Sequence, residues 1–497
     1  MEALDWIVIG VFALALIGII VWVVKQKQND SADYFLGGRD ATWLAIGASI
    51  FASNIGSEHL IGLAGAGASS GMAMAHWEIQ GWMILILGWV FVPFYSRSMV
   101  YTMPEFLERR YNSQSRTILS VISLISYVLT KVAVTVYAGG LVFQQVFGIK
   151  ELWGIDFFWI AAIGLVVLTA LYTIFGGMKS VLYTSVLQTP ILLLGSLIIL
   201  VLGFKELGGW DEMMRICGAV TVNDQGNTMT ELIRSNDDPN FPWLGALIGS
   251  AIIGFWYWCT DQFIVQRVLS GKNQKEARRG TIFGAYLKLL PVFLFLIPGM
   301  IAFALHQKYI GDGGFLPLLA NGTPNADAAF PTLVAKILPA GVKGLVVCGI
   351  LAALMSSLAS LFNSSAMLFT IDFYKRFKPQ TSEKKLVVIG QIATVVIVIL
   401  GILWIPIMRS VGDVLYTYLQ DVQSVLAPGI AAAFLLGITW KKTSAQGGMW
   451  GLIAGMVIGL TRLGAKVYYS NATVTDSSLF KYLFYDLNWL FFCGCMF

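Results

Sequence analysis

The chain is poor in charged residues, which make up only 12% of its 497 residues, about half of the ~25% found in soluble domains. Hydrophobic residues account for 57%, and the mean hydropathy is positive. A soluble protein needs a far more highly charged surface. The composition therefore excludes the soluble globular class and indicates a protein embedded in a membrane.

Cysteine and histidine are scarce as well. The five cysteines have neither the spacing of a metal site nor the pattern of a disulfide framework, and histidine occurs three times. We find no metal cluster and no nucleophile–base pair, so we predict that the protein is not an enzyme. The formal net charge of +5 is explained by basic loops between apolar runs, and we expect no nucleic-acid partner.

Apolar runs of about 20 residues, the length of a helix that crosses a bilayer, dominate the chain. They predict an all-α membrane protein with about thirteen transmembrane helices and with the lipid bilayer as a partner. The predicted spans are 5–24, 41–68, 76–96, 117–146, 156–176, 181–203, 242–267, 281–305, 331–371, 386–407, 413–438, 446–465 and 478–497.

Lysine and arginine gather in alternate loops, as expected of loops that face the cytoplasm. One set of loops holds clusters such as Arg109, Arg110 and Arg116, whereas the opposite set includes the long segment 204–241 and is richer in acidic residues. This asymmetry predicts that the N-terminus is outside, and we expect a multi-pass protein of the plasma (cell inner) membrane.

Both ends of the sequence are apolar. The run from Trp6 to Val24 follows two acidic residues and has no small-residue cleavage site, so we expect a retained span rather than a signal peptide. The last run continues to Phe497, and we expect that the original C-terminus lies further on.

Two of the spans are interrupted by polar and glycine residues. The first break is the segment 54–59, Asn-Ile-Gly-Ser-Glu-His, and the second is the segment 257–262, Tyr-Trp-Cys-Thr-Asp-Gln. Lipid cannot bond the backbone groups that such a break frees, so unwound backbone is tolerated only where it lines a cavity. Two broken helices in matching positions indicate a secondary transporter with a solute held between inverted repeats.

Several segments resemble the sodium/solute symporter family, and within it the sodium/glucose cotransporter branch. They are the segments 33–39, 51–57, 256–262, 286–289 and 355–364. The resemblance covers residues 30–465 and implies a LeuT-like core, an inverted five-helix repeat whose first and sixth core helices are broken. The implied division is an extra helix and loop (1–40), the first repeat (41–203), an extracellular loop (204–241), the second repeat (242–438) and extra helices (439–497).

The resemblance also implies a sugar site. Its contacts fall on the polar residues Asn54, His59, Glu78, Lys288 and Gln420, with Tyr257 or Trp258 as a stacking or gating wall. A sugar is a ring of hydroxyls with apolar faces, so it needs convergent polar groups and a flat wall. The outer gate is implied at Leu63, Trp77 and Tyr416.

Each of these residues also has a plainer interpretation. Glu78 and Lys288 could serve only to neutralise one another, because charges inside a membrane usually pair. His59 could bond the backbone at the helix break, and Gln420 could be a contact between helices. The gate residues could simply pack. Lys131, in the middle of its span, is expected to pair with a polar neighbour or to reach the interface.

The cofactor implied is a sodium ion. Its ligands would be the carbonyls of Ala52, Ile55 and Ala353 and the hydroxyls of Ser356 and Ser357, since a helix break exposes carbonyls that coordinate such a cation.

Three positions depart from the family pattern. Ser185 stands where an Asp is common, and Ala359 where a Thr is common, which puts a second sodium in doubt. Gly254 replaces a polar residue that faces sugar in relatives.

From this we predict a sodium-coupled symporter that imports a small-molecule sugar, glucose or galactose, by alternating access, with one sodium per sugar. A carrier of another polyol, such as myo-inositol, mannose or fructose, would share the same contacts. A sugar-gated sensor with little transport is a third possibility, which Gln420 disfavours because it is not an acid.

Overall fold

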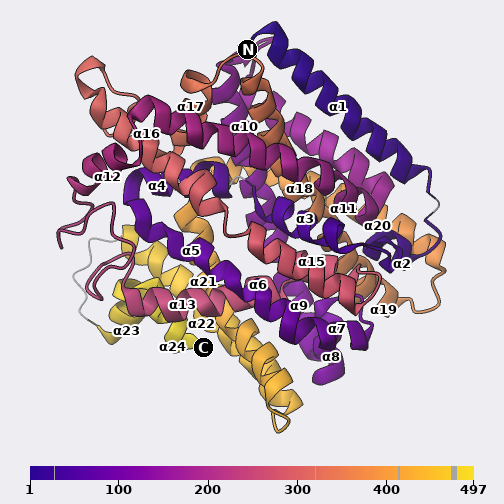
Figure 1. Cartoon of the computed structure of the whole chain (residues 1–497). Coiled ribbons are helices and arrows are strands. Elements are labelled where there is room, and N and C mark those ends of the chain that lie inside the picture. The colour runs from indigo at the N-terminus through magenta and orange to yellow at the C-terminus, as the bar shows by residue number, and fades with distance from the viewer. Residues whose placement is uncertain (27, 57, 320, 412–414, 472–477) are drawn as a thin grey trace.

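The computed structural model describes residues 1–497 except 27, 57, 320, 412–414 and 472–477, and it describes no side chains at 129, 130, 407–421, 467, 470 and 471. The described chain is almost entirely helical (Figure 1). Its strands are β1 (Glu151–Leu152) and β2 (Ile155–Asp156), which pair antiparallel in a small hairpin.

The N-terminal half contains the long helices α1 (Ala3–Val24), α3 (Trp43–Asn54), α9 (Ser113–Ser126), α10 (Ala133–Phe147) and α11 (Phe157–Leu207). Shorter elements lie between them: α2 (Ser31–Leu36), η1 (Gly37–Arg39), η2 (Glu58–Leu63), α4 (Ala64–Ser70), η3 (Gly71–Met74), α5 (Ala75–Ile79), η4 (Gln80–Trp82), α6 (Met83–Ile86), η5 (Leu87–Phe91), α7 (Val92–Ser98), α8 (Met103–Arg110), η6 (Tyr127–Val132) and α12 (Trp210–Gly218).

The C-terminal half contains the long helices α13 (Trp243–Phe255), α15 (Gln274–Leu287), α16 (Ile297–Lys308), α18 (Val342–Met367), α20 (Glu383–Val411), α21 (Leu415–Thr439) and α22 (Ala445–Asn471). The shorter elements are η7 (Trp256–Thr260), α14 (Gln262–Leu269), η8 (Val292–Leu296), η9 (Ile310–Asp312), η10 (Ala326–Ala328), α17 (Ala329–Ile337), η11 (Leu368–Tyr374), α19 (Lys375–Phe377), α23 (Leu479–Lys481), η12 (Tyr482–Asp486) and α24 (Trp489–Met496).

Within the described residues, 9 helical segments are long and apolar enough to cross a membrane. Some of them hold more than one predicted span. Helix α11 has 51 residues and bends at Gly177, which has φ +54°. A Cβ atom at Gly177 would lie 2.4 Å from the carbonyl oxygen of Tyr34, so glycine is required at this bend between the predicted spans 156–176 and 181–203.

The predicted span 478–497 does not form one helix. Helix α24 begins anew after Asn488, whose side chain accepts a hydrogen bond from the backbone N–H of Leu490 at 2.8 Å. Asn competes well for a helix N-cap, so the apolar run is divided into α23, η12 and α24.

Both predicted helix breaks are confirmed. Helix α3 ends at Asn54, and Ile55 is extended, with φ −78° and ψ 103°. In the second break, the π turn η7 ends at Thr260, and the next residue, Asp261, is extended and caps α14 through its carboxylate.

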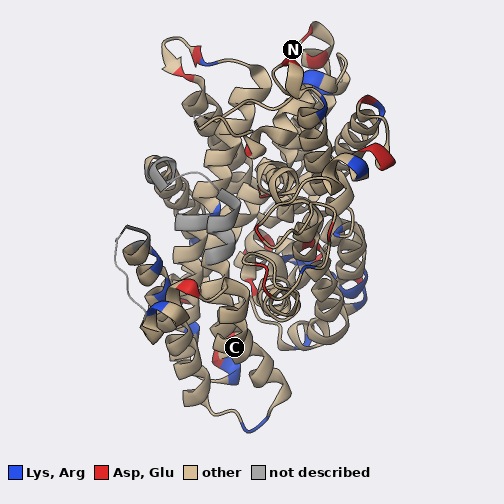
Figure 2. Ribbon diagram, turned by 90° about the vertical axis from the view of Figure 1, so that its left-hand side faces the viewer, with Lys and Arg blue, Asp and Glu red and all other residues tan. Residues whose placement is uncertain are grey.

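Helix α18 packs against α11 and α3 at the centre of the molecule, and α15 packs along α3. Figure 2 shows Lys, Arg, Asp and Glu mainly on loops and helix ends, with most of the ribbon tan. Charged residues that are buried among the helices are therefore exceptional. Glu78 and Lys288 are two of them, and they lie at the candidate site described next.

Candidate functional site

Three charged or polar side chains meet next to the first helix break. The ammonium of Lys288 lies 2.6 Å from one carboxylate oxygen of Glu78 and 2.7 Å from Nε2 of His59. Nε2 of His59 lies 3.2 Å from the other carboxylate oxygen. All three residues are buried, at 3% to 4% exposure. The chain thus brings together residues from η2, α5 and the end of α15 that are up to 229 positions apart.

A second polar pair joins the two helix breaks. The side-chain N–H of Asn54 donates to the hydroxyl of Tyr257 at 3.0 Å. Trp258 is adjacent to the first cluster, because its ring centroid lies 5.6 Å from Nζ of Lys288. The indole therefore provides a flat apolar surface beside the charged groups.

Near the two breaks, several buried side-chain atoms have no hydrogen-bond partner in the part of the chain that the structure describes. They include Oδ1 of Asn54, Nδ1 of His59 and Oε1 of Gln80, all buried. A buried polar atom without a partner is costly, so these atoms can receive the hydroxyls of a ligand. Gln80 was not predicted from the sequence. The one sequence feature related to Gln80 is Gly254, the position that departs from the family pattern. A Cβ atom at Gly254 would lie 2.8 Å from Oε1 of Gln80, so the glycine leaves room for this side chain.

The predicted gate residues are only partly described. Leu63 is fully buried, and Trp77 stacks on Trp489 with ring centroids 4.9 Å apart. The side chains of Tyr416 and of the predicted sugar contact Gln420 lie outside the described residues. Their roles stay predictions.

The predicted sodium ligands lie where the first break meets α18. The hydroxyl of Ser357 is 3.4 Å from the carbonyl oxygen of Ile55 and donates to the carbonyl of Ser53 at 2.8 Å. A Cβ at Gly56 would lie 2.8 Å from that hydroxyl, so the glycine allows this approach. Ala52 and Ala353 are buried, at 1% exposure.

Ser53 was missed by the sequence analysis, although it lies within the same motif. Its hydroxyl is 3.3 Å from that of Ser356 and 2.7 Å from that of Ser360. Among the described residues no group of three or more His, Cys, Asp or Glu could hold a metal. The oxygens that meet at Ser53, Ile55 and Ser357 are carbonyls and a hydroxyl, which suit a monovalent hard cation.

The comparisons with known proteins bear on this geometry. The model of the sodium:solute symporter family matches residues 34–455. The chain belongs to the sodium:solute symporter family. It is 38% identical over 485 residues to "Sodium/myo-inositol cotransporter 2" of Homo sapiens, covering 94% of this chain and 71% of that protein. It is 37% identical over 511 residues to "Sodium/glucose cotransporter 4" of Danio rerio, covering 99% of this chain and 76% of that protein.

Solved structures confirm the fold of this symporter. A sodium-coupled sialic acid symporter in a substrate-bound outward-open state matches with a TM-score of 0.79 at 22% identity, covering 100% of this chain and 95% of that one. MhsT in complex with L-phenylalanine matches with a TM-score of 0.54 at 13% identity, covering 85% and 98%. At these identities the likeness concerns the LeuT-like fold alone, which the sequence predicted.

Lys131 pairs with the buried carboxylate of Asp261 and does not reach the membrane interface. Its ammonium lies 2.7 Å from one carboxylate oxygen of Asp261, and the hydroxyl of Tyr127 donates to the other oxygen. Lys131 also lies 4.7 Å from the ring centroid of Tyr257. The pair thus fixes the second helix break against η6.

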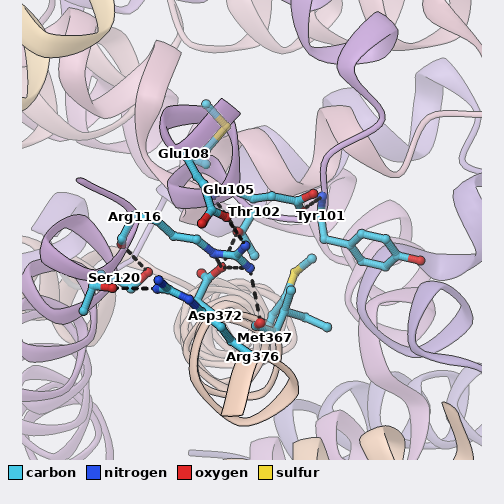
Figure 3. Close-up of polar contacts among 12 residues, drawn as sticks. Tyr101, Thr102, Glu105, Glu108, Arg116, Ser120, Met367, Asp372 and Arg376 are labelled. Atoms are coloured by element: carbon cyan, nitrogen blue, oxygen red, sulfur yellow. Dashed lines mark hydrogen bonds and ion pairs between the residues drawn. The ribbon is translucent and has the colours of Figure 1, made fainter. Parts of the chain in front are cut away.

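A partly buried ionic cluster joins the start of α9 to η11, the π turn that follows α18 (Figure 3). Nε of Arg116 donates to Oδ1 of Asp372 at 2.7 Å, and its Nη1 lies 2.6 Å from Glu108. The hydroxyl of Thr102, which caps α8, donates to Asp372 at 2.8 Å. The next residue, Met103, is tied to the second broken helix, because its N–H donates to Oε1 of Gln262 at 2.8 Å.

This cluster makes Asp372 a stability determinant. The side chain of Asp372 has 0% exposure, so Asp372→Ala leaves Nε of Arg116 and the Thr102 hydroxyl without this acceptor, while Nη1 of Arg116 keeps Glu108. We expect a loss of about 3 kcal/mol, measured as a lower midpoint of thermal unfolding in detergent. The matched control is Glu212→Ala, which breaks the exposed pair with Arg215 and should leave the midpoint nearly unchanged. Equal midpoints for the two variants would contradict the prediction.

Proposed function

We propose that the chain imports a neutral sugar, glucose or galactose, together with sodium by alternating access, across a plasma or inner membrane in which its N-terminus is outside. The observation that carries the proposal is the buried cluster of Glu78, His59 and Lys288. The carboxylate and the ammonium cancel in charge, so the cluster offers both donors and acceptors to a polyol without demanding a charged solute.

The unpartnered atoms beside this cluster support the same solute. Oδ1 of Asn54 and Oε1 of Gln80 are acceptors, and Nδ1 of His59 is a ring nitrogen that can donate or accept. The hydroxyls of a sugar suit all three atoms, since every hydroxyl can both donate and accept a hydrogen bond. The ring of Trp258 adds the flat wall against which the apolar face of a sugar can stack.

Myo-inositol is the second candidate substrate. Its support is that the similar proteins include sodium/myo-inositol cotransporters at 38% identity, and a ring of hydroxyls without a ring oxygen would use the same donors and acceptors. Uptake of labelled glucose, galactose and myo-inositol into proteoliposomes, with and without a sodium gradient, tests both candidates. The proposal fails if none of the three is taken up in a sodium-dependent way.

Glu78 should be required for sugar affinity but not for sodium binding. Glu78→Gln removes the charge that holds Lys288 and His59, and each unmet group in a dry cavity costs about 1–3 kcal/mol. We expect the sugar concentration for half-maximal uptake to rise at least tenfold, with sodium binding retained. Glu212→Gln, on the surface, is the control. Unchanged sugar affinity in Glu78→Gln would remove Glu78 from the site.

Ser357 should be required for sodium affinity. Its hydroxyl is directed at the carbonyls of Ser53 and Ile55, so Ser357→Ala removes one oxygen from the proposed sodium shell. The sodium concentration for half-maximal uptake should rise several-fold, while the exposed control Ser69→Ala behaves as the unmodified protein. Uptake driven by protons in place of sodium would refute the assignment.

We propose a stoichiometry of one sodium per sugar, because Ser185 and Ala359 offer no carboxylate for a second ion and an uncompensated charge inside the membrane is costly. A tenfold sodium gradient gives about 1.4 kcal/mol and 100 mV gives about 2.3 kcal/mol, so one ion supports about 500-fold accumulation. The reversal potential of sugar-coupled current measures the ratio. A ratio near two sodium ions per sugar in the unmodified protein would contradict the proposal. A ratio near one that increases in a Ser185→Asp, Ala359→Thr double variant would support it.

A further inference from the structure

Arg267 is a buried cation that the proposed transport site does not use. It lies in α14, directly after the second helix break, and is 1% exposed. Its Nε donates to the hydroxyl of Ser49 in α3 at 3.1 Å, and its guanidinium lies over the ring of Phe263 at 4.9 Å. Its Nη2 is buried and has no hydrogen-bond partner among the residues that the structure describes.

The charge of Arg267 is not balanced by a carboxylate in contact with it. Asp261, six positions earlier on the same broken helix, is held by Lys131 at 2.7 Å and by Tyr127. Among the described residues, Arg267 takes part in no ion pair within 4.0 Å. A charge inside a membrane protein is costly without a partner, and here an unsatisfied N–H donor accompanies the unpaired charge.

The hydroxyl of Ser49, on the α3 side of Arg267, offers a further donor, and no described carboxylate pairs with the guanidinium there. Ser49 receives hydrogen bonds from Nε of Arg267 and from the hydroxyl of Ser185 at 3.4 Å. Among the described residues no hydrogen bond is donated by Ser49, so its own proton is free. The free N–H of Arg267 and the free hydroxyl proton of Ser49 can both donate to one acceptor. The positive charge of the guanidinium favours an acceptor that carries a negative charge.

The same hydroxyls lead to the proposed sodium shell. The hydroxyl of Ser185 lies 3.3 Å from that of Ser356. Arg267 is thus three hydrogen-bonded steps, through Ser49 and Ser185, from a proposed sodium ligand. An unbalanced guanidinium at this distance repels sodium, because interactions between charges are weakly screened in a buried setting.

We propose that a small monovalent anion, such as chloride, binds between Nη2 of Arg267 and the hydroxyl of Ser49, beside Ser185, whose own proton goes to the carbonyl of Val181 at 2.6 Å. The anion offsets the charge of Arg267 and thereby strengthens sodium binding at the neighbouring shell. This inference rests on the sodium site of the proposed function. A fixed carboxylate at position 185 would supply the same negative charge and make the anion unnecessary.

The test uses the full chain in detergent and needs no sugar. Binding of radiolabelled sodium is measured at constant ionic strength with either chloride or gluconate as the anion, since gluconate is too large for a site between three side chains. In the unmodified protein, the half-saturating sodium concentration should be at least tenfold higher in gluconate, a difference of about 1.4 kcal/mol.

Two variants test the site in different ways. Ser185→Asp should bind sodium with the same affinity in both anions, because it carries its own negative charge. Arg267→Met should also lose the difference, because the cation that needs the anion is gone, and it adds no carboxylate that could itself attract sodium. Ser69→Asp, which adds a carboxylate to an exposed residue, should keep the tenfold difference.

The outcomes separate this inference from the proposed function. Saturable sodium binding that is equal in chloride and gluconate would overturn the anion site and leave the sodium site intact. A difference between the anions that persists in both Ser185→Asp and Arg267→Met would also overturn it, since the anion would then act elsewhere. Absence of saturable sodium binding in either anion would refute the sodium site on which the inference depends.

Discussion

The structure depends on satisfying backbone groups that two helix breaks free at membrane depth. Lipid cannot form hydrogen bonds with these groups, so other groups of the protein must do so. Ser357 in α18 donates to the carbonyl of Ser53 at the first break, and the hydroxyl of Tyr95 donates to the carbonyl of Cys259 at the second, at 2.7 Å. Only helices that pack directly on the breaks can do this, and that requirement places α18 against α3 in the centre of the fold.

Charged side chains inside the membrane follow the same constraint. Glu78 pairs with Lys288, and Asp261 pairs with Lys131. Each pair joins elements that are far apart in the sequence, and each involves or touches a broken helix. Any conformational change of this symporter therefore has to keep these pairs together or replace each partner by water or solute, since a separated buried charge is costly. Arg267 lacks such a pair among the described residues, which is why it stands out.

The two candidate sites share the first break, which would couple the binding of their ligands. Asn54 ends α3 and bonds Tyr257 of the second break, while the neighbouring Ile55 and Ser53 carbonyls lie at the hydroxyl of Ser357. A cation that draws these carbonyls together would fix the backbone on which Asn54 stands. Sodium affects solute affinity to the extent that it favours this arrangement over others.

The sequence by itself determined the class of the protein and the positions of both breaks, whereas the residues of the sugar and sodium sites were implied by the family resemblance and stay predictions. It could do so because hydropathy over about 20 residues reports a span and a polar motif within a span is rare. Neither the pairing of Lys131 with Asp261 nor the unpartnered atoms of Gln80 and Arg267 follows from the sequence. Those depend on which helices cross and how closely, and that is decided by tertiary packing among residues separated by 100 positions or more. The single span predicted at 478–497 was wrong for a local reason, since Asn488 caps a new helix within a run whose mean hydropathy alone favours continuity.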